Sequence, residues 1–325
     1  MPILTFVIPD SYTKNERLDK YVASLPESLN RSHLKSSALK ITLNQKEVKL
    51  SRKVRAGDKI EIVWEDSFVQ DIKAQDIPLD ILYEDDSVCV VNKKQGMVTH
   101  PACGNWEGTL VNALLFHWGR ETILQNKMPE SEEDFTKLRP GIVHRLDKDT
   151  SGVIITAKNR KAEEWLQGQF KNHSSIQKEY LAICIGRPPK HHDKIRTHIV
   201  RDNKDRKRFK ATEDSSEGKF AETHYVCIAC YGNYSLMRVR ILTGRTHQIR
   251  VHMKYIHCPI LGDSIYGTEC KEFKNATLML HASKLKIRLP FQSELSEFSA
   301  PLPNRFKIVM KKLHSKYAKY IIPKK

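Results

Sequence analysis

Apolar residues near the N-terminus recur at helical spacing in two stretches. The first begins after Arg17, and the second follows Ser32, whose hydroxyl is suited to cap a helix N-terminus. Both stretches predict short amphipathic helices. Their apolar positions are Leu18, Tyr21, Val22 and Leu25 in the first, and Leu34, Ala38 and Leu39 in the second.

Short apolar runs after these helices predict strands. The runs cover residues 41–43 and 60–64 and are bounded by turn residues. We therefore expect a small α/β module over residues 13–66. Residues 67–79 are charged and show little periodicity, which is typical of a linker.

From residue 80 to residue 325 the pattern mixes strands and helices, and we expect a larger second domain there. Helical patterns follow Thr109 and Asn159, and a basic helix lies near the C-terminus. The helix after Asn159 is expected to turn Ala162, Trp165, Leu166 and Phe170 inward. Strand-like runs cover residues 88–91, 153–157, 177–183 and 234–242.

A polar loop at residues 141–152 begins with two apolar residues and leads into an apolar strand. Loops held by strands often carry catalytic side chains. Asp149 is followed by Thr, Ser and Gly, which is typical of a turn residue whose carboxylate accepts bonds from backbone N–H groups. Asp147 has no such local explanation. From residue types alone it is either a catalytic carboxylate or a structural one paired with Arg145 or Lys148.

Positive charge is in excess from end to end of the chain. The 325 residues contain 55 Lys and Arg against 38 Asp and Glu, a formal net charge of +17. This excess favours a nucleic-acid partner over a merely solvated surface. No apolar run approaches the roughly 18 residues of a membrane span, and no secretory signal is evident. We therefore expect no membrane association and a cytoplasmic location.

The seven cysteines are scattered and do not indicate a disulfide framework. Cys227 and Cys230 have metal-like spacing, but no second pair accompanies them, and their surroundings alternate as in a strand. His247 and His252 are five positions apart, which does not place them on one face of a helix. We expect no metal site.

The polar loop resembles a known catalytic motif, that of the RluA-type RNA pseudouridine synthases, which convert uridine in RNA to its C-glycoside isomer. Further segments similar to family motifs lie at residues 92–101, 177–183 and 243–252, so the resemblance covers nearly all of the chain. It implies an α+β fold, with an active-site cleft crossing a long mixed, mostly antiparallel sheet. The reaction requires no redox step or energy input, so no cofactor is expected. The loop motif reads His144-Arg145-Leu146-Asp147-Lys148-Asp149-Thr150-Ser151-Gly152.

The resemblance implies catalytic roles for Asp147, Tyr180 and Arg250. Asp147 would attack C1′ of the uridine, add to C6 of its ring or remove the 2′ proton, and the sequence leaves these three open. Tyr180 would stack on the base, although a tyrosine in a strand is more often a core residue. Arg250 would orient Asp147, with phosphate binding as its alternative role.

Other residues are expected to contact RNA. Arg145 would fill the space that a flipped base leaves, Arg245 is a candidate for phosphate binding, and His247 lies in the same motif. Residues 13–66 resemble an S4 RNA-binding domain, although Gln45 stands where that family commonly has Gly. The S4 family carries a basic face, and a merely solvated module is the alternative. In this chain that face would contain Arg31, Lys35 and Lys40.

By resemblance the expected substrate is large-subunit ribosomal RNA, either free or in a pre-ribosomal particle, and a monomer is the default. The rival function is a non-catalytic RNA-binding or ribosome-assembly protein. The set of Asp147, Tyr180 and Arg250 favours catalysis, because an acid in a basic groove repels phosphate. A metal-dependent nuclease lacks a coherent ligand set. The acidic insertion at residues 121–138 shows no role in sequence.

Overall fold

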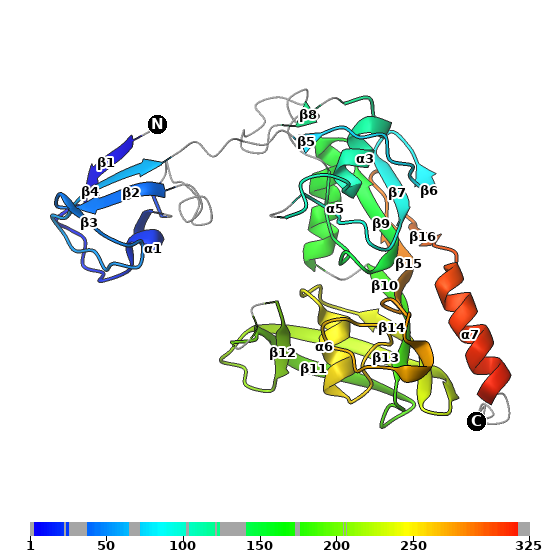
Figure 1. Cartoon of the computed structure of the whole chain (residues 1–325). Coiled ribbons are helices and arrows are strands. Elements are labelled where there is room, and N and C mark those ends of the chain that lie inside the picture. The colour runs from blue at the N-terminus through cyan, green and yellow to red at the C-terminus, as the bar shows by residue number, and fades with distance from the viewer. Residues whose placement is uncertain are drawn as a thin grey trace. The chain divides into compact units, whose positions relative to one another are not determined.

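The computed structural model divides the chain into two compact units, residues 1–70 and 71–325 (Figure 1). No helix among the described residues is long and apolar enough to span a membrane. The described residues are 3–22, 24–25, 38–64, 72–101, 104–120, 122–123, 141–172, 176–203, 205 and 207–317.

The first unit is a four-stranded antiparallel sheet with a short helix against it. The strand order is β1-β4-β2-β3. Leu18, Tyr21 and Val22 of the helix are buried in one core with Ile60 and Ile62 of the sheet. The elements are β1 Ile3–Val7, α1 Leu18–Val22, β2 Ala38–Leu43, β3 Lys46–Glu47 and β4 Lys59–Trp64.

The expected helix after Arg17 is present as α1, and the two expected strands lie within β2 and β4. The second helix was predicted to include Ala38, which is wrong because Ala38 pairs with Trp64 in the sheet. Lys40 lies exposed on β2. Arg31 and Lys35 fall outside the described residues.

The turn between β2 and β3 places two residues in the left-handed region. Asn44 has a φ of 51° and Gln45 a φ of 66°, although Gln carries a Cβ that disfavours this region. The Asn44 side chain accepts a 2.8 Å hydrogen bond from the Lys59 N–H and donates a 2.9 Å bond to Asp58. These bonds tie the turn to β4, so it forms without glycine.

The second unit is organised around a ten-stranded sheet, with the order β12-β11-β13-β14-β10-β15-β9-β7-β6 and β16 paired to β15. Its neighbouring strands pair antiparallel, except β9 and β15, which are parallel. The expected α+β fold with a mixed, mostly antiparallel sheet is therefore confirmed. The strands are β6 Ile81–Glu84, β7 Val88–Lys93, β9 Ser151–Ala157, β10 Gln177–Ile185, β11 His192–Arg201, β12 Phe209–Thr212, β13 Lys219–Tyr231, β14 Tyr234–Ile241, β15 Leu280–Arg288 and β16 Leu295–Ser299.

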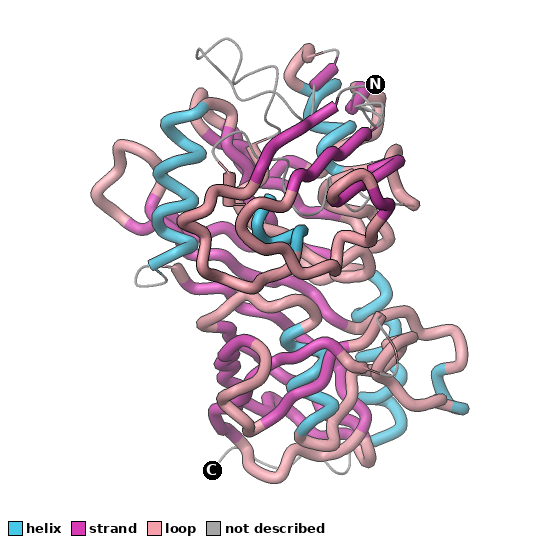
Figure 2. Tube along the Cα trace, turned by 90° about the vertical axis from the view of Figure 1, so that its left-hand side faces the viewer, coloured by secondary structure: helices cyan, strands magenta, loops and turns pink. Residues whose placement is uncertain are grey.

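Helices cover both faces of this sheet. Along β7, Cys89 and Val91 share a core with α3, whereas Val88 and Val90 share another with α5. In Figure 2 the long helix α5 (cyan) lies outside the strands of the sheet (magenta). The helices are α3 Leu110–His117, α5 Arg160–Asn172, α6 Gln248–Tyr255, the 3₁₀ helix η1 Lys271–Phe273 and α7 Asn304–Tyr317.

Two sequence expectations need correction here. Trp165 of α5 is 42% exposed rather than core, because its indole N–H reaches over the surface to donate to the Arg288 carbonyl. Residues 72–79, expected in the linker, belong to the second unit. There Ile72 is buried, and β5 Ile72–Lys73 pairs with β8 Thr122–Ile123. Apart from residues 122–123, the acidic insertion lies outside the described residues.

Candidate active site

The loop before β9 begins in a conformation that only glycine tolerates. Gly141 has a φ of 65°, and a Cβ there would lie 1.8 Å from the Ala157 carbonyl oxygen. Next to it, the ring of His144 stacks on Phe170 with centroids 4.5 Å apart, and its Nε2 accepts a 3.0 Å hydrogen bond from the Ile155 N–H. Burial lowers the pKa of His144 to about 3, so the ring is a neutral, structural acceptor.

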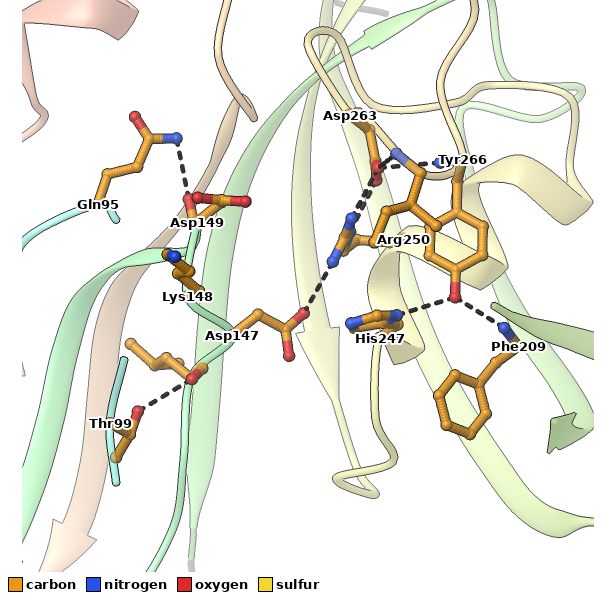
Figure 3. Close-up of polar contacts among 12 residues, drawn as sticks. Gln95, Thr99, Asp147, Lys148, Asp149, Phe209, His247, Arg250, Asp263 and Tyr266 are labelled. Carbon is orange, nitrogen blue, oxygen red and sulfur yellow. Dashed lines mark hydrogen bonds and ion pairs between the residues drawn. The ribbon is translucent and has the colours of Figure 1, made fainter. Parts of the chain in front are cut away.

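Side chains from the end of β7 and from the segment after it fix the backbone of residues 146–149. Figure 3 shows the bonds from Thr99 and Gln95. Three carbonyls of the loop are thereby satisfied, which sets the direction of the side chain between them. Within the described part of the chain the Asp149 side chain makes no hydrogen bond, contrary to its expected role as a turn residue. The three bonds run from Thr99 Oγ1 to the Leu146 carbonyl at 3.0 Å, from Lys93 Nζ to the Lys148 carbonyl at 3.2 Å and from Gln95 Nε2 to the Asp149 carbonyl at 2.9 Å.

Asp147 and Arg250 come together across the sheet. Nη1 of Arg250 lies 3.5 Å from Oδ2 of Asp147 (Figure 3). The Arg250 side chain is 4% exposed and the Asp147 side chain 22%. The arginine is therefore part of the protein interior, whereas the carboxylate keeps a face open to a ligand.

Asp263 holds Arg250 in place from the other side. It accepts bonds from Nε and Nη2 of Arg250, both at 2.8 Å, and also from the backbone N–H groups of Ile265 and Tyr266. Burial alone would lower the pKa of Arg250, but the bonds and charge of Asp263 raise it. Burial would raise the pKa of Asp263, but the bond from Arg250 lowers it. Both groups therefore stay ionised, and Arg250 points one nitrogen at Asp147.

Sequence reasoning missed the roles of Asp263 and Tyr266. The guanidinium of Arg250 lies 5.2 Å from the centre of the Tyr266 ring. The signal in the sequence is the string Gly-Asp-Ser-Ile-Tyr-Gly at residues 262–267, but nothing in that string indicates a contact with Arg250. Gly262 permits this turn, since a Cβ there would meet the Thr277 carbonyl oxygen at 2.3 Å.

Tyr180 lies on β10 and lines the same pocket as Asp147 and Arg250. It is 7% exposed. Burial, and then the charge of Asp147, raise the pKa of its phenol. The pocket thus offers a neutral aromatic ring beside the carboxylate that Arg250 contacts.

Three further expected RNA-contacting residues, Arg145, Arg245 and His247, line this pocket. Arg145 is exposed, and Arg245 donates through Nε to the Phe220 carbonyl at 2.9 Å. His247 Nδ1 lies 2.9 Å from the Tyr266 hydroxyl, and burial lowers the pKa of its ring despite the charge of Asp147. The pocket therefore combines one open carboxylate with cationic side chains from two loops.

The cysteine pair noted in the sequence lies on β13, where Sγ of Cys227 is 3.4 Å from Sγ of Cys230. His252 is buried between the hydroxyls of Thr197 and Thr223. Within the described part of the chain, no group of three or more His, Cys, Asp or Glu side chains is arranged to hold a metal ion.

Comparison with known proteins identifies similar chains. A family model described as RNA pseudouridylate synthase matches residues 87–255. Ribosomal large subunit pseudouridine synthase D of Borreliella burgdorferi is 40% identical over 300 residues, which cover 90% of this chain and 88% of that protein. An uncharacterized RNA pseudouridine synthase of Bacillus subtilis is 39% identical over 292 residues, covering 89% of this chain and 91% of that one. A solved human structure, RNA pseudouridylate synthase domain containing 4, superimposes with a TM-score of 0.54 at 23% identity, covering 72% of this chain and 92% of that chain, and shows a shared fold.

Proposed function

Because the chain belongs to the RNA pseudouridylate synthase family, we propose that it isomerises uridines of large-subunit ribosomal RNA with Asp147 as the catalytic carboxylate. Its activity is that of an RNA pseudouridine synthase. The choice of RNA is supported by similarity to the Borreliella burgdorferi protein, whose name assigns it to the large ribosomal subunit. The observation that carries the catalytic assignment is the Asp147 carboxylate, which Arg250 orients into a basic pocket beside Tyr180.

The reaction breaks the N1–C1′ bond of uridine and joins C5 of the same uracil to C1′. N1 gains a proton and C5 loses one, so atoms and electrons balance without a redox partner, and we expect no cofactor. Asp147 would serve by attacking C1′, by adding to C6 or by removing the 2′ proton. Arg250 favours the ionised carboxylate and fixes its direction in all three cases.

The position of Asp147 argues against a protein that only binds RNA. Its carboxylate is partly open to a pocket that also contains Arg145 and Arg245, where RNA phosphates would approach. A negative charge at this point weakens phosphate binding, so it would be a disadvantage in a protein that only binds RNA. A catalytic carboxylate explains its presence.

Tyr180 would offset the cost of moving the target uridine out of its stack. Flipping a base costs a few kcal/mol. Stacking on an aromatic ring returns about 1–3 kcal/mol per base. Because the Tyr180 phenol stays protonated and makes no hydrogen bond to a described side chain, its ring is the feature that we expect to matter.

We predict that Tyr180→Ala loses far more activity than Tyr180→Phe. Removal of the stacking surface should lower kcat/KM by about fivefold to 150-fold, corresponding to about 1–3 kcal/mol. Phenylalanine keeps the ring and should stay close to wild type. The measurement is the initial rate on one RNA substrate for the three proteins, and equal rates for Ala and Phe would argue against stacking.

We propose that residues 13–66 act as an S4 RNA-binding domain, with Arg31, Lys35 and Lys40 on its basic face. Support comes from the small α/β unit and from Lys40, which lies exposed on β2. We also propose that the enzyme acts as a monomer in the cytoplasm. Sedimentation of the full chain with and without RNA would test the oligomeric state.

The test of the proposed function is release of tritium from RNA labelled at C5 of uracil. C5 loses its hydrogen when it bonds to C1′, so each isomerisation releases the label. We expect release from large-subunit ribosomal RNA and none from transfer RNA. Release from transfer RNA alone would overturn the choice of substrate. No release from either RNA or from intact ribosomal particles would favour the non-catalytic binding protein.

A further inference from the structure

Lys178 is a buried cation to which no role in the active site has yet been assigned. It lies on β10 two residues before Tyr180, so both side chains point to the same face of the sheet. The residue is 8% exposed, and its Nζ lies 5.9 Å from the centre of the Phe170 ring. Among the described residues it has no hydrogen-bond acceptor and no carboxylate partner. Buried lysines without partners are costly to the folded state.

The charges around Lys178 increase this cost. Burial, and then the positive charge of Arg245, lower the pKa of Lys178 to about 8. Burial, and then the positive charge of Lys178, lower the pKa of His144 to about 3, so this ring is neutral. Glu179 is adjacent in sequence, but it points to the other face and lies 4.0 Å from Arg238. Among the described residues, therefore, no carboxylate pairs with either of these two cations.

Gly244 lies between Lys178 and the active-site pocket. A Cβ placed on Gly244 would lie 3.9 Å from Lys178 Nζ, and Gly244 is exposed and lines the pocket with Arg245 and Asp147. Arg245 uses its Nε for the Phe220 carbonyl, whereas its two terminal nitrogens make no hydrogen bond to a described residue. The guanidinium of Arg245 thus lines the pocket itself, and the ammonium of Lys178 lies directly behind Gly244 of its wall.

We propose that Lys178 and Arg245 together bind one backbone phosphate of the RNA next to the target uridine. This inference rests on the proposed function. A phosphate oxygen accepts strong bonds from both cation types, and it would neutralise the repulsion between them. A flipped nucleotide needs its backbone held while the base rotates, and phosphate contacts supply that positioning.

The pH dependence of binding distinguishes Lys178 from its neighbours. Burial lowers the pKa of the Lys178 ammonium to about 8, so the group loses its proton as the pH rises through about this value. His144 stays neutral because its pKa is lowered to about 3, and burial raises the pKa of Tyr180, so neither titrates near pH 8. Burial also lowers the pKa of Lys93, behind the catalytic loop, to about 7. Any effect of Lys93 on activity would appear at lower pH and would persist in Lys178→Arg, which separates it from that of Lys178. Wild-type kcat/KM should therefore fall above pH 8, and Lys178→Arg should remove this fall because arginine does not deprotonate.

The experiment compares Lys178→Gln, Lys178→Arg and the control Lys286→Gln by tritium release and by RNA binding at several salt concentrations. Lys286 lies on the adjacent strand and is paired with Glu297 at 2.6 Å, so its replacement removes the same charge elsewhere. We expect Lys178→Gln to raise KM about tenfold or more with kcat largely kept. Its slope of log affinity against log salt should decrease by about 0.7, as for one lost phosphate on a single strand. Lys178→Arg should restore KM, and Lys286→Gln should match wild type.

A KM and a salt slope of Lys178→Gln equal to those of wild type would overturn the proposal. A fall in kcat without a change in KM would also overturn it, since that pattern indicates support of Tyr180 rather than phosphate binding. If Lys178→Gln does not fold, the pH profile of Lys178→Arg decides, and a fall above pH 8 like that of wild type counts against the proposal. Failure of the proposed function itself is recognised separately, because the wild-type protein would then release no tritium.

Discussion

Asp147→Asn should lose at least about a thousandfold in turnover and still bind RNA. Asparagine has nearly the same shape but cannot act as a nucleophile or base at this position. Arg250 keeps both bonds to Asp263, so the fold around the site should stay intact. Loss of a negative charge from a basic pocket should leave RNA affinity equal or higher. Tritium release and filter binding on the same RNA measure the two effects.

The matched control is Asp149→Asn, the same change two residues along the same loop. The loop contact of Asp149 uses its backbone carbonyl, which the substitution preserves. We expect this variant to keep most of the activity. If both variants were equally inactive, the loss would reflect damage to the loop, and substantial activity in Asp147→Asn would remove Asp147 from the catalytic role.

Asp263→Asn should destabilise the second unit and also impair catalysis. The new amide N–H₂ group faces one of the two Arg250 donors, so one hydrogen bond is lost. The Arg250 guanidinium, which is only 4% exposed, also loses the negative charge that balanced it. Breaking a buried ion pair costs about 3–5 kcal/mol, which corresponds to a fall in Tm of roughly 6–20 °C for a domain of this size. Loss of the fixed direction of Arg250 should lower kcat about a hundredfold in the protein that remains folded. Thermal unfolding and tritium release below the Tm separate the two effects.

Glu297→Gln serves as control, because Glu297 pairs with Lys284 and Lys286 at the surface and should change Tm little. Pairing lowers the folded-state pKa of Asp263, so its stabilisation is full above the unfolded-state value of about 3.9 and is lost as pH falls. The Tm difference between wild type and Asp263→Asn should therefore shrink on acidification. A Tm equal to wild type at neutral pH would contradict the role of Asp263 as the anchor of Arg250.

Local patterns predicted the strands and helices that line the site. The runs at residues 88–91, 153–157, 177–183 and 234–242 lie in β7, β9, β10 and β14. The failures have a common physical cause, which is that contacts distant in sequence override local preference. Ala38 fits a helix but pairs with Trp64, and Trp165 has core periodicity but bonds to Arg288 at the surface.

The site was predictable only as far as its motifs extend. Sequence motifs indicated Asp147, Tyr180 and Arg250, and the structure brings these three to one pocket. The contact of Asp263 with Arg250 was not visible, because Asp263 is reached only after a turn following α6. Lys178 was equally hidden, since burial and the nearness of Arg245 arise only when the strands are assembled.

The parallel pairing of β9 with β15 also sets the order in which the enzyme matures during synthesis. Ser151, at the end of the catalytic loop, bonds to His281, which lies 130 positions later in the chain. Contacts of such long sequence separation form slowly, because a large loop must close before they add any stability. A nascent chain that has been synthesised only as far as Asp147 therefore has its carboxylate but lacks Arg250, Asp263 and the strand beside the loop. We therefore expect activity only after synthesis has passed β15.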